Sequence, residues 1–392
     1  MRSIYLDFNS TAPLLPEVAA AMAAAEAVGY ANPASQHAAG RKAHRVLEDT
    51  REEIARLLGA DIISPHTADR FVFCSGGTEA NNLALLGLTG ALRPVQSAAG
   101  PGRIVISAIE HPSVTAAADY LAQLGWQVDR LEVTGDGTVR LEHLDALLAA
   151  QSPLGMPRLV SVMLANNETG VIQPIDEVVR RCAAAGVPVH TDAVQAVGKM
   201  PIHFRDLDVA AMTVAPHKFH GPRGTAALVV RNGIPLHPVL HGATQQFGLR
   251  PGTESVSLAI GFLAALNAWQ REAGDRPRRM AKLRDCFEAG VQAAYPDATV
   301  NGLHAARLPH TSNIAFVGRD RQSLLMALDL AGICCSTGSA CASGSSEPSP
   351  TLLAMGVPQE IVASSLRFSF GATTDIADVD EAISRIAKVL GG

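Results

Sequence analysis

Short apolar segments that favour strands alternate along this chain with longer segments that favour helices. The strand segments are continuous apolar runs, as expected when both faces of a sheet are covered. The expected strands are 70–74, 103–107, 159–164, 188–192, 209–214 and 225–230, and the expected helices among them are 79–88, 112–124 and 175–185. This alternation predicts an α/β fold with a mostly parallel sheet, which binds ligands at the carboxyl ends of its strands.

The pattern changes after about residue 255. The segments that follow are two long helices at 255–273 and 277–294, isolated strands at 312–317 and 365–370, and a final helix at 375–390. We therefore predict a large cofactor-binding domain over residues 14–255 and a smaller α+β domain formed by residues 1–13 and 256–392. Residues 336–350 are rich in Ser and Gly with almost no apolar content, so we expect a mobile loop there.

Composition excludes several classes of function. The chain of 392 residues is 47% hydrophobic, and its net charge of −5 gives no argument for a nucleic-acid or anionic-membrane partner. No apolar run is long enough to span a bilayer, and the N-terminus lacks the apolar core of a signal peptide, so we expect a cytoplasmic protein. The six cysteines are scattered and lack metal-ligand spacing, which predicts neither a disulfide framework nor a metal site.

Lys218 follows the apolar run 209–214 and opens a Gly/Pro turn, and Asp192 ends the strand before it. Pyridoxal phosphate requires this pair, because a lysine amine carries its aldehyde carbon as a Schiff base and a carboxylate keeps its pyridine nitrogen protonated. The alternative is a surface lysine and an aspartate that caps a helix. Gln195 would face the phenolic oxygen of the same ring, or else be an ordinary polar residue on a first helical turn.

Other polar residues also follow expected strands. The segment 75–78, Ser-Gly-Gly-Thr, can bind a phosphate with its N–H groups and hydroxyls, or simply cap the next helix. His111 can stack on a flat ring or shuttle a proton, although a lone histidine in a loop is more often structural. Asn166 and Asn167 can line a binding crevice or form an Asx-turn.

Two residues of the C-terminal third are further candidates. Cys341 lies alone in the Ser/Gly loop, where a thiol is exposed and free to act as a nucleophile; the alternative is an incidental surface cysteine. Arg367 can hold a substrate carboxylate through two hydrogen bonds, although an arginine on the surface of an edge strand is the alternative.

Together these motifs resemble those of the cysteine desulfurases, pyridoxal-phosphate enzymes with the aspartate-aminotransferase type of fold. The resemblance covers nearly the whole chain, and the Ser/Gly loop is similar to that of the long-loop group, which serves iron–sulfur cluster assembly. The matching segments are Y-L-D-F-N-S-T-A-P from Tyr5, N-P-A-S-Q-H from Asn32, S-G-G-T-E-A-N-N from Ser75, I-E-H-P around His111, N-N-E-T-G from Asn166, H-T-D-A-V-Q-A-V-G-K from His190, A-P-H-K at Lys218, R-P-G-T ending at Thr253 and T-G-S-A-C ending at Cys341.

The resemblance implies conversion of L-cysteine to L-alanine, with the sulfur held on Cys341 as a persulfide and passed to an acceptor protein such as an iron–sulfur scaffold or a sulfur carrier. It implies that Lys218 holds the cofactor, that His111 stacks on the ring and assists proton transfer, and that Asp192 and Gln195 tune the ring. The remaining implied roles are phosphate binding by Gly77, Thr78 and His217, contact of Asn167 with cofactor or substrate, binding of the cysteine carboxylate by Arg367, and a homodimer in which Thr253 reaches the neighbouring subunit's phosphate.

The chain departs from the family pattern at two positions. Ala215 stands where the family often has a serine that bonds the phosphate, so one hydrogen bond of about 1.5–3 kcal/mol is missing. Gly77 stands where alanine is usual, which should be tolerated because the backbone supplies the donor. The pattern gives no function for Cys334 and Cys335.

Two other functions are compatible with the same motifs. An aminotransferase or selenocysteine lyase of the same fold would use the same lysine, but transamination has no need of a thiol such as Cys341. A catalytically weak sulfur-assembly partner would have no need of the intact set Lys218, Asp192, His111 and Cys341.

Overall fold

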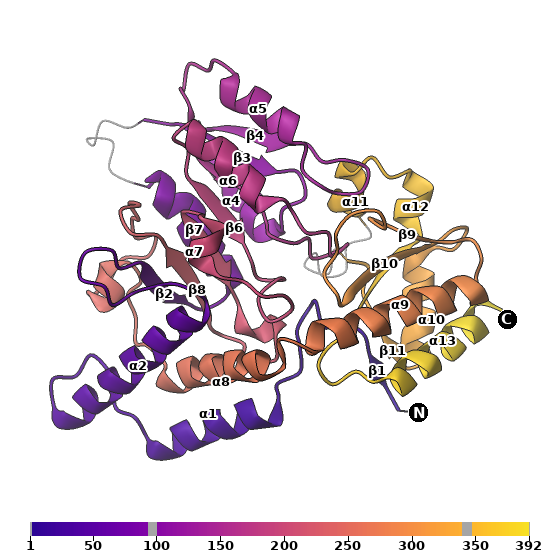
Figure 1. Cartoon of the computed structure of the whole chain (residues 1–392), viewed down its shortest axis with the longest axis horizontal. Helices are drawn as coiled ribbons and strands as arrows, with labels where there is room; N and C mark the ends of the chain where they lie inside the picture. The colour runs from indigo at the N-terminus through magenta and orange to yellow at the C-terminus, as the bar shows by residue number, and fades with distance from the viewer. Residues whose placement is uncertain (1, 93–99, 339–346, 392) are drawn as a thin grey trace.

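A seven-stranded sheet forms the centre of the larger part of the molecule, on the left of Figure 1. The computed structural model describes residues 2–92, 100–338 and 347–391. The strands run in the spatial order β2 (Arg70–Cys74), β8 (Ala226–Val230), β7 (Ala211–Val214), β6 (Val189–Asp192), β5 (Pro157–Ser161), β3 (Arg103–Ser107) and β4 (Gln127–Leu131). All neighbours from β7 to β4 are parallel, and β8 is antiparallel to both β7 and β2.

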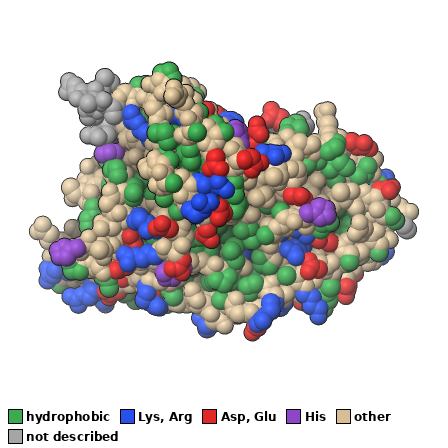
Figure 2. Space-filling model, turned by 45° about the horizontal axis from the view of Figure 1, so that its top comes forward, with side chains coloured by type: hydrophobic (Ala, Val, Ile, Leu, Met, Phe, Trp, Pro, Cys, Tyr) green, Lys and Arg blue, Asp and Glu red, His purple; other side chains and the backbone are tan. Residues whose placement is uncertain are grey.

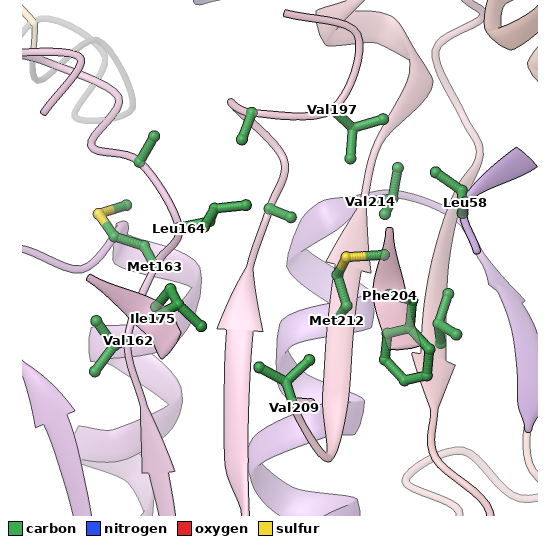
Figure 3. Close-up of a cluster of buried hydrophobic side chains, with 14 of the residues drawn as sticks. Leu58, Val162, Met163, Leu164, Ile175, Val197, Phe204, Val209, Met212 and Val214 are labelled. Carbon is green, nitrogen blue, oxygen red and sulfur yellow. The ribbon is translucent and has the colours of Figure 1, made fainter. Parts of the chain in front are cut away.

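Helices cover both faces of this sheet because successive side chains of a strand point to opposite sides. One face packs against α3 (Gly77–Asn82), the π-helical turn η1 (Leu83–Gly87) and α4 (Pro112–Gln123). The other face packs against α1 (Pro16–Val28), α2 (Ala38–Leu57), α5 (Leu141–Ala149), α6 (Ile175–Ala184), α7 (Phe204–Leu207) and α8 (Val256–Glu272). In Figure 3, Met212 and Val214 of β7 point to this second face, toward Phe204 of α7.

The smaller part of the molecule, on the right of Figure 1, has its own hydrophobic core. Its antiparallel sheet has the order β12 (Ser365–Ser369), β10 (Thr311–Phe316) and β9 (Ala298–Val300). The N-terminal strand β1 (Ile4–Tyr5) pairs in parallel with β11 (Ile333–Cys334), so both ends of the chain lie in this part. Its helices are α9 (Arg276–Ala294), α10 (Arg321–Leu330), α11 (Pro350–Ala354), α12 (Gln359–Ala363) and α13 (Ile376–Leu390).

The α/β prediction is confirmed, with corrections to individual elements. Strand β4 and helix α5 were not predicted, because the edge strand β4, Q-V-D-R-L, carries two charged residues and does not form an apolar run. Strand β5 ends at Ser161 instead of Leu164, although Leu164 still donates to the carbonyl of Asp192 (2.9 Å).

The predicted boundary at residue 255 stays a prediction, and the packing of α8 suggests a later one. Helix α8 packs on α1 and α2, and Phe262 and Leu266 share the core of the large sheet. We therefore propose that the small domain begins after α8.

Charged groups of both signs are interspersed over the face shown in Figure 2. Among the helices of the described residues, none is both long and apolar enough to cross a membrane.

Candidate active site

The turn that carries Lys218 lies where strands β6 and β7 end. These strands are neighbours in the sheet, and Asp192 is in register with Thr213, just before the end of β7. A short 3-10 turn, η2 (Pro216–Lys218), then places the lysine at this edge. The Lys218 Nζ donates to the carbonyl oxygens of Asn9 (2.7 Å) and Ser10 (3.0 Å). The N-terminal segment therefore crosses the site, which the sequence reasoning missed because these residues lie more than 200 positions from the lysine.

A chain of hydrogen bonds joins Asp192 to His111. Asp192 is 5% exposed, and its Oδ2 accepts from the Asn81 Nδ2 at 2.7 Å. The same amide group lies 2.8 Å from the Ser113 Oγ, which is in turn 2.8 Å from the His111 Nδ1. The sequence reasoning did not single out Asn81 or Ser113. Asn81 lies four residues after Gly77, on the helix face that meets the strand ends. This spacing is the feature of the sequence that could have identified Asn81 as a site residue.

The electrostatic setting keeps His111 neutral. Burial lowers the pKa of its imidazole; the carboxylate of Asp192 opposes this, and the charges of Lys218 and Arg367 add to it. A neutral imidazole can accept a proton at neutral pH.

The residues predicted to bind the phosphate lie on two turns, the glycine-containing turn before α3 and the turn η2 that carries His217. Gly76 precedes the first turn of α3, and the N–H groups that begin the helix have no partner within it. A methyl group built on Gly77 would lie 3.4 Å from Val194 Cγ2 and 3.8 Å from the Ala215 methyl, so the alanine usual in the family would fit here. Thr78 is exposed beside this turn. Burial, and then the charge of Lys218, lower the pKa of His217 to about 4, so its imidazole is a neutral hydrogen-bonding group.

Gln195 supplies an unsatisfied polar group to the site. Its side chain is 5% exposed and its Nε2 donates to the Asn9 carbonyl (3.1 Å), while its Oε1 is buried without a hydrogen-bond partner among the described residues. A buried amide with an unused atom indicates a ligand that the residues themselves do not provide.

Arg367 is buried, which excludes the alternative of a surface arginine. The strand β12 lies at the edge of its sheet, but the arginine side chain is 3% exposed because it turns toward the large domain. Its Nη2 donates to Asp7 (2.7 Å) and to Ser10 Oγ (2.8 Å), and its Nη1 donates to the Asn167 carbonyl (3.0 Å). Its Nε is buried and has no acceptor among the residues described, which leaves one donor of the guanidinium unsatisfied.

A cavity of about 350 Å³ opens beside these groups. Its walls include Glu110, His111, Asn167 and Glu168, together with residues on both sides of the segment 339–346. The sequence reasoning assigned roles to His111 and Asn167, whereas the two glutamates appeared only as members of the motifs I-E-H-P and N-N-E-T-G. Burial raises the pKa of Glu110 to about 8 and also raises the pKa of Glu168.

One predicted residue, Thr253, lies outside this cluster. Thr253 is exposed and lines a separate cavity of about 170 Å³ with Ser75 and Arg250. Cys341 lies outside the described residues. Cys335 lies near Asp7 and Arg367, and burial raises the pKa of its thiol, so it is a poor nucleophile in this position.

Comparison with known proteins identifies the family. The family Aminotransferase class-V matches residues 4–382. The chain is 36% identical over 389 residues to the cysteine desulfurase IscS of Dictyoglomus turgidum, covering 99% of this chain and 95% of that protein. It is 36% identical to the cysteine desulfurase NifS of Azotobacter vinelandii, covering 100% and 93%. The crystal structure of a NifS-like protein from Rickettsia africae superimposes with a TM-score of 0.88 at 31% identity and covers the whole of both chains.

The fold and the strand-end lysine therefore belong to a pyridoxal-phosphate protein of the aminotransferase class-V family. Within that family, the chain belongs with the cysteine desulfurases. The described residues fit the cofactor of this family: an amine at Lys218, a buried carboxylate at Asp192, an unsatisfied amide at Gln195, and free N–H groups at the start of α3.

Proposed function

We propose that this protein removes the sulfur of L-cysteine and passes it to Cys341. The C–S bond of the substrate breaks, an S–S bond forms at Cys341, and the β-carbon of the substrate gains a proton in place of the sulfur, so that L-cysteine and a thiol give L-alanine and a persulfide. A sulfur-acceptor protein, such as an iron–sulfur scaffold or a sulfur carrier, then takes up the sulfane sulfur. Cytoplasmic location stays a prediction.

Pyridoxal phosphate supplies an electron sink for the bonds at the substrate α-carbon. The residues around it have separate tasks. Lys218 would carry the cofactor, Asp192 would place its carboxylate near the ring nitrogen, and Asn81 donates to that carboxylate and so orients it. Gln195 would bind the phenolic oxygen, and Gly77, Thr78 and His217 would bind the phosphate. His111 would stack on the ring and assist proton transfer, and its hydrogen bonds with Ser113, which in turn accepts from Asn81, fix the orientation of its imidazole.

The contact between Arg367 and the residues that precede Cys341 is the observation that carries this proposal. Arg367 and Ser336 exchange two backbone hydrogen bonds (2.6 and 3.1 Å), and the Arg367 Nη1 is 3.4 Å from the carbonyl oxygen of Gly338. Cys341 is three residues further along the chain, and three residues span at most about 10 Å. The thiol is thus tethered within reach of the arginine that would hold the substrate carboxylate, as desulfuration requires and transamination does not.

Replacement of Cys341 by serine tests this function. The Cys341→Ser protein should keep the absorption band of the bound cofactor and should still change its spectrum on addition of L-cysteine. It should release neither alanine nor sulfide at a useful rate. Brief exposure of the wild type to L-cysteine should add one sulfur to the peptide that carries Cys341, detected by mass spectrometry. Normal turnover by the mutant, or added sulfur found only on Cys334 or Cys335, would refute the mechanism.

We also propose that the active unit is a homodimer. The loop before Thr253 presents Phe247, which is 82% exposed and has a φ of 61°, a conformation that is rare for a large side chain. The Gln246 side chain holds this loop, because its amide pairs with both the N–H (2.7 Å) and the carbonyl (3.0 Å) of Phe73 on the edge strand β2. An exposed aromatic residue on a rigid loop is typical of a protein interface.

A further inference from the structure

The two ends of the segment that carries Cys341 meet at one carboxylate, that of Glu168. On the C-terminal side, the Ser349 Oγ donates to Glu168 Oε2 at 2.7 Å. On the N-terminal side, Gly338 passes so close that a methyl group built on it would lie 2.7 Å from the same oxygen. Gly338 has a φ of 89°, a backbone conformation that favours glycine.

Glu168 is itself held rigidly. Glu168 is 3% exposed. Its backbone N–H donates to Asn166 Oδ1 (2.8 Å), and its backbone carbonyl accepts from Asn313 Nδ2 (3.3 Å). Both backbone groups are thus fixed by buried asparagines, one from each part of the molecule. A rigid acceptor can fix the positions of the two segments that flank residues 339–346.

The carboxylate also lies beside the substrate arginine. The preceding residue, Asn167, accepts from the Arg367 Nη1 through its carbonyl (3.0 Å), and the same nitrogen is 3.4 Å from the Gly338 carbonyl. Burial raises the pKa of Glu168, whereas the hydrogen bonds of Ser349 and Thr351 and the charges of Arg367 and Arg321 lower it. The arginine thus bonds the N-terminal flank and the residue before Glu168, and Glu168 itself bonds the C-terminal flank.

We propose that Glu168 is a positioning residue for the transfer of sulfur to Cys341: its carboxylate accepts a hydrogen bond from Ser349 on the C-terminal flank of the cysteine segment and packs against Gly338 on the N-terminal flank, next to Arg367. This inference rests on the proposed role of Cys341. Anchoring both ends of a segment restricts the volume that its thiol explores and raises the effective concentration of that thiol at the substrate. In this proposal Glu168 contacts no reacting atom. Its loss should therefore slow the transfer of sulfur to Cys341 and leave the earlier binding of L-cysteine unchanged.

Single-turnover experiments on the cofactor-loaded protein separate these two steps. The first readout is the rate of the absorbance change when L-cysteine is added, and the second is the rate at which sulfur appears on Cys341 by mass spectrometry. In Glu168→Ala the first rate should stay within about twofold of the wild type. The second should fall about tenfold to a hundredfold, the range expected when a buried hydrogen bond to a carboxylate is lost.

Glu168→Gln is the matched control, because its amide oxygen can still accept from Ser349. Its sulfur-transfer rate should stay within about threefold of the wild type. Ser349→Ala removes the same hydrogen bond from the other side and should slow the same step, which keeps the test decisive if Glu168→Ala does not fold.

Three results would overturn the inference: equal loss of both rates in Glu168→Ala, no loss of the second rate, or a glutamine variant as slow as the alanine variant. A wild type that carries no added sulfur on Cys341 would instead refute the proposed function itself.

Discussion

Glu110 should destabilise the folded protein increasingly as the pH rises, and Glu110→Gln should remove that effect. The glutamate is 6% exposed; its Oε1 accepts from the Ser107 hydroxyl (2.5 Å) and the Met163 N–H (2.7 Å), and its Oε2 has no partner among the described residues. Burial raises the pKa of this carboxyl from 4.5 to about 8, and the nearby charge of Asp192 adds to the increase.

The magnitude follows from proton linkage. Above pH 4.5 the unfolded chain loses this proton, while the folded protein keeps it until about pH 8, so folding must take up a proton in this interval. The stability of the wild type therefore falls by about 1.4 kcal/mol per pH unit from this group, and by about 5 kcal/mol over the whole interval. Glutamine does not titrate, so the advantage of the variant should grow from pH 4.5 to 8 and then remain constant.

Thermal unfolding from pH 5 to 9 with saturating cofactor measures this difference. For a chain of this length, 1 kcal/mol corresponds to about 1 °C in Tm, so the Tm difference between variant and wild type should increase by about 4–5 °C between pH 5 and pH 8. Glu52→Gln, at an exposed position of α2, is the control and should follow the wild type at every pH. A Tm difference for Glu110→Gln that is independent of pH would refute the reasoning.

Four further predictions concern the cofactor and the interface. Lys218→Ala should lose the covalent link to the cofactor, measured by borohydride reduction and peptide mapping; a label on any other lysine would contradict the assignment. Ala215→Ser should tighten cofactor binding about tenfold, because the methyl of Ala215 faces Gly77 at the phosphate site, and equal or weaker affinity in equilibrium dialysis would argue against it. Asn81→Ala should weaken cofactor binding by at least about tenfold in the same assay, since Asp192 loses a hydrogen bond to its charge, and unchanged affinity would exclude this role. Phe247→Asp should shift the protein from dimer to monomer in sedimentation, whereas Leu330→Asp on α10, at a residue that is 88% exposed, should not; a dimeric Phe247→Asp protein would place the interface elsewhere.

The chain's own pattern was sufficient for the α/β class and for the placement of Asp192 and Lys218 at one edge of the sheet. Strands such as 226–230 pair with neighbours on both sides and are covered on both faces, so their residues are continuously apolar. Such an apolar run can be recognised in the sequence alone. Asp192 and Lys218 follow consecutive parallel strands, and parallel strands that are neighbours bring such residues to one edge. Local rules therefore predicted this pair.

Contacts between distant segments decided the rest. Among the described residues, strand β4 has one neighbour, and its polar residues interrupt any apolar run without a regular alternation, so the sequence gave no strand signal. The burial of Arg367 depends on Asp7, which is 360 positions away, and the environment of Lys218 depends on Asn9, 209 positions away. Glu168 was only one letter of a matching motif until the fold placed Gly338 and Ser349 against its carboxylate. Strand and helix periodicity reports which face of an element is buried, whereas the partner of a buried polar group is fixed only when the two parts of the chain pack together.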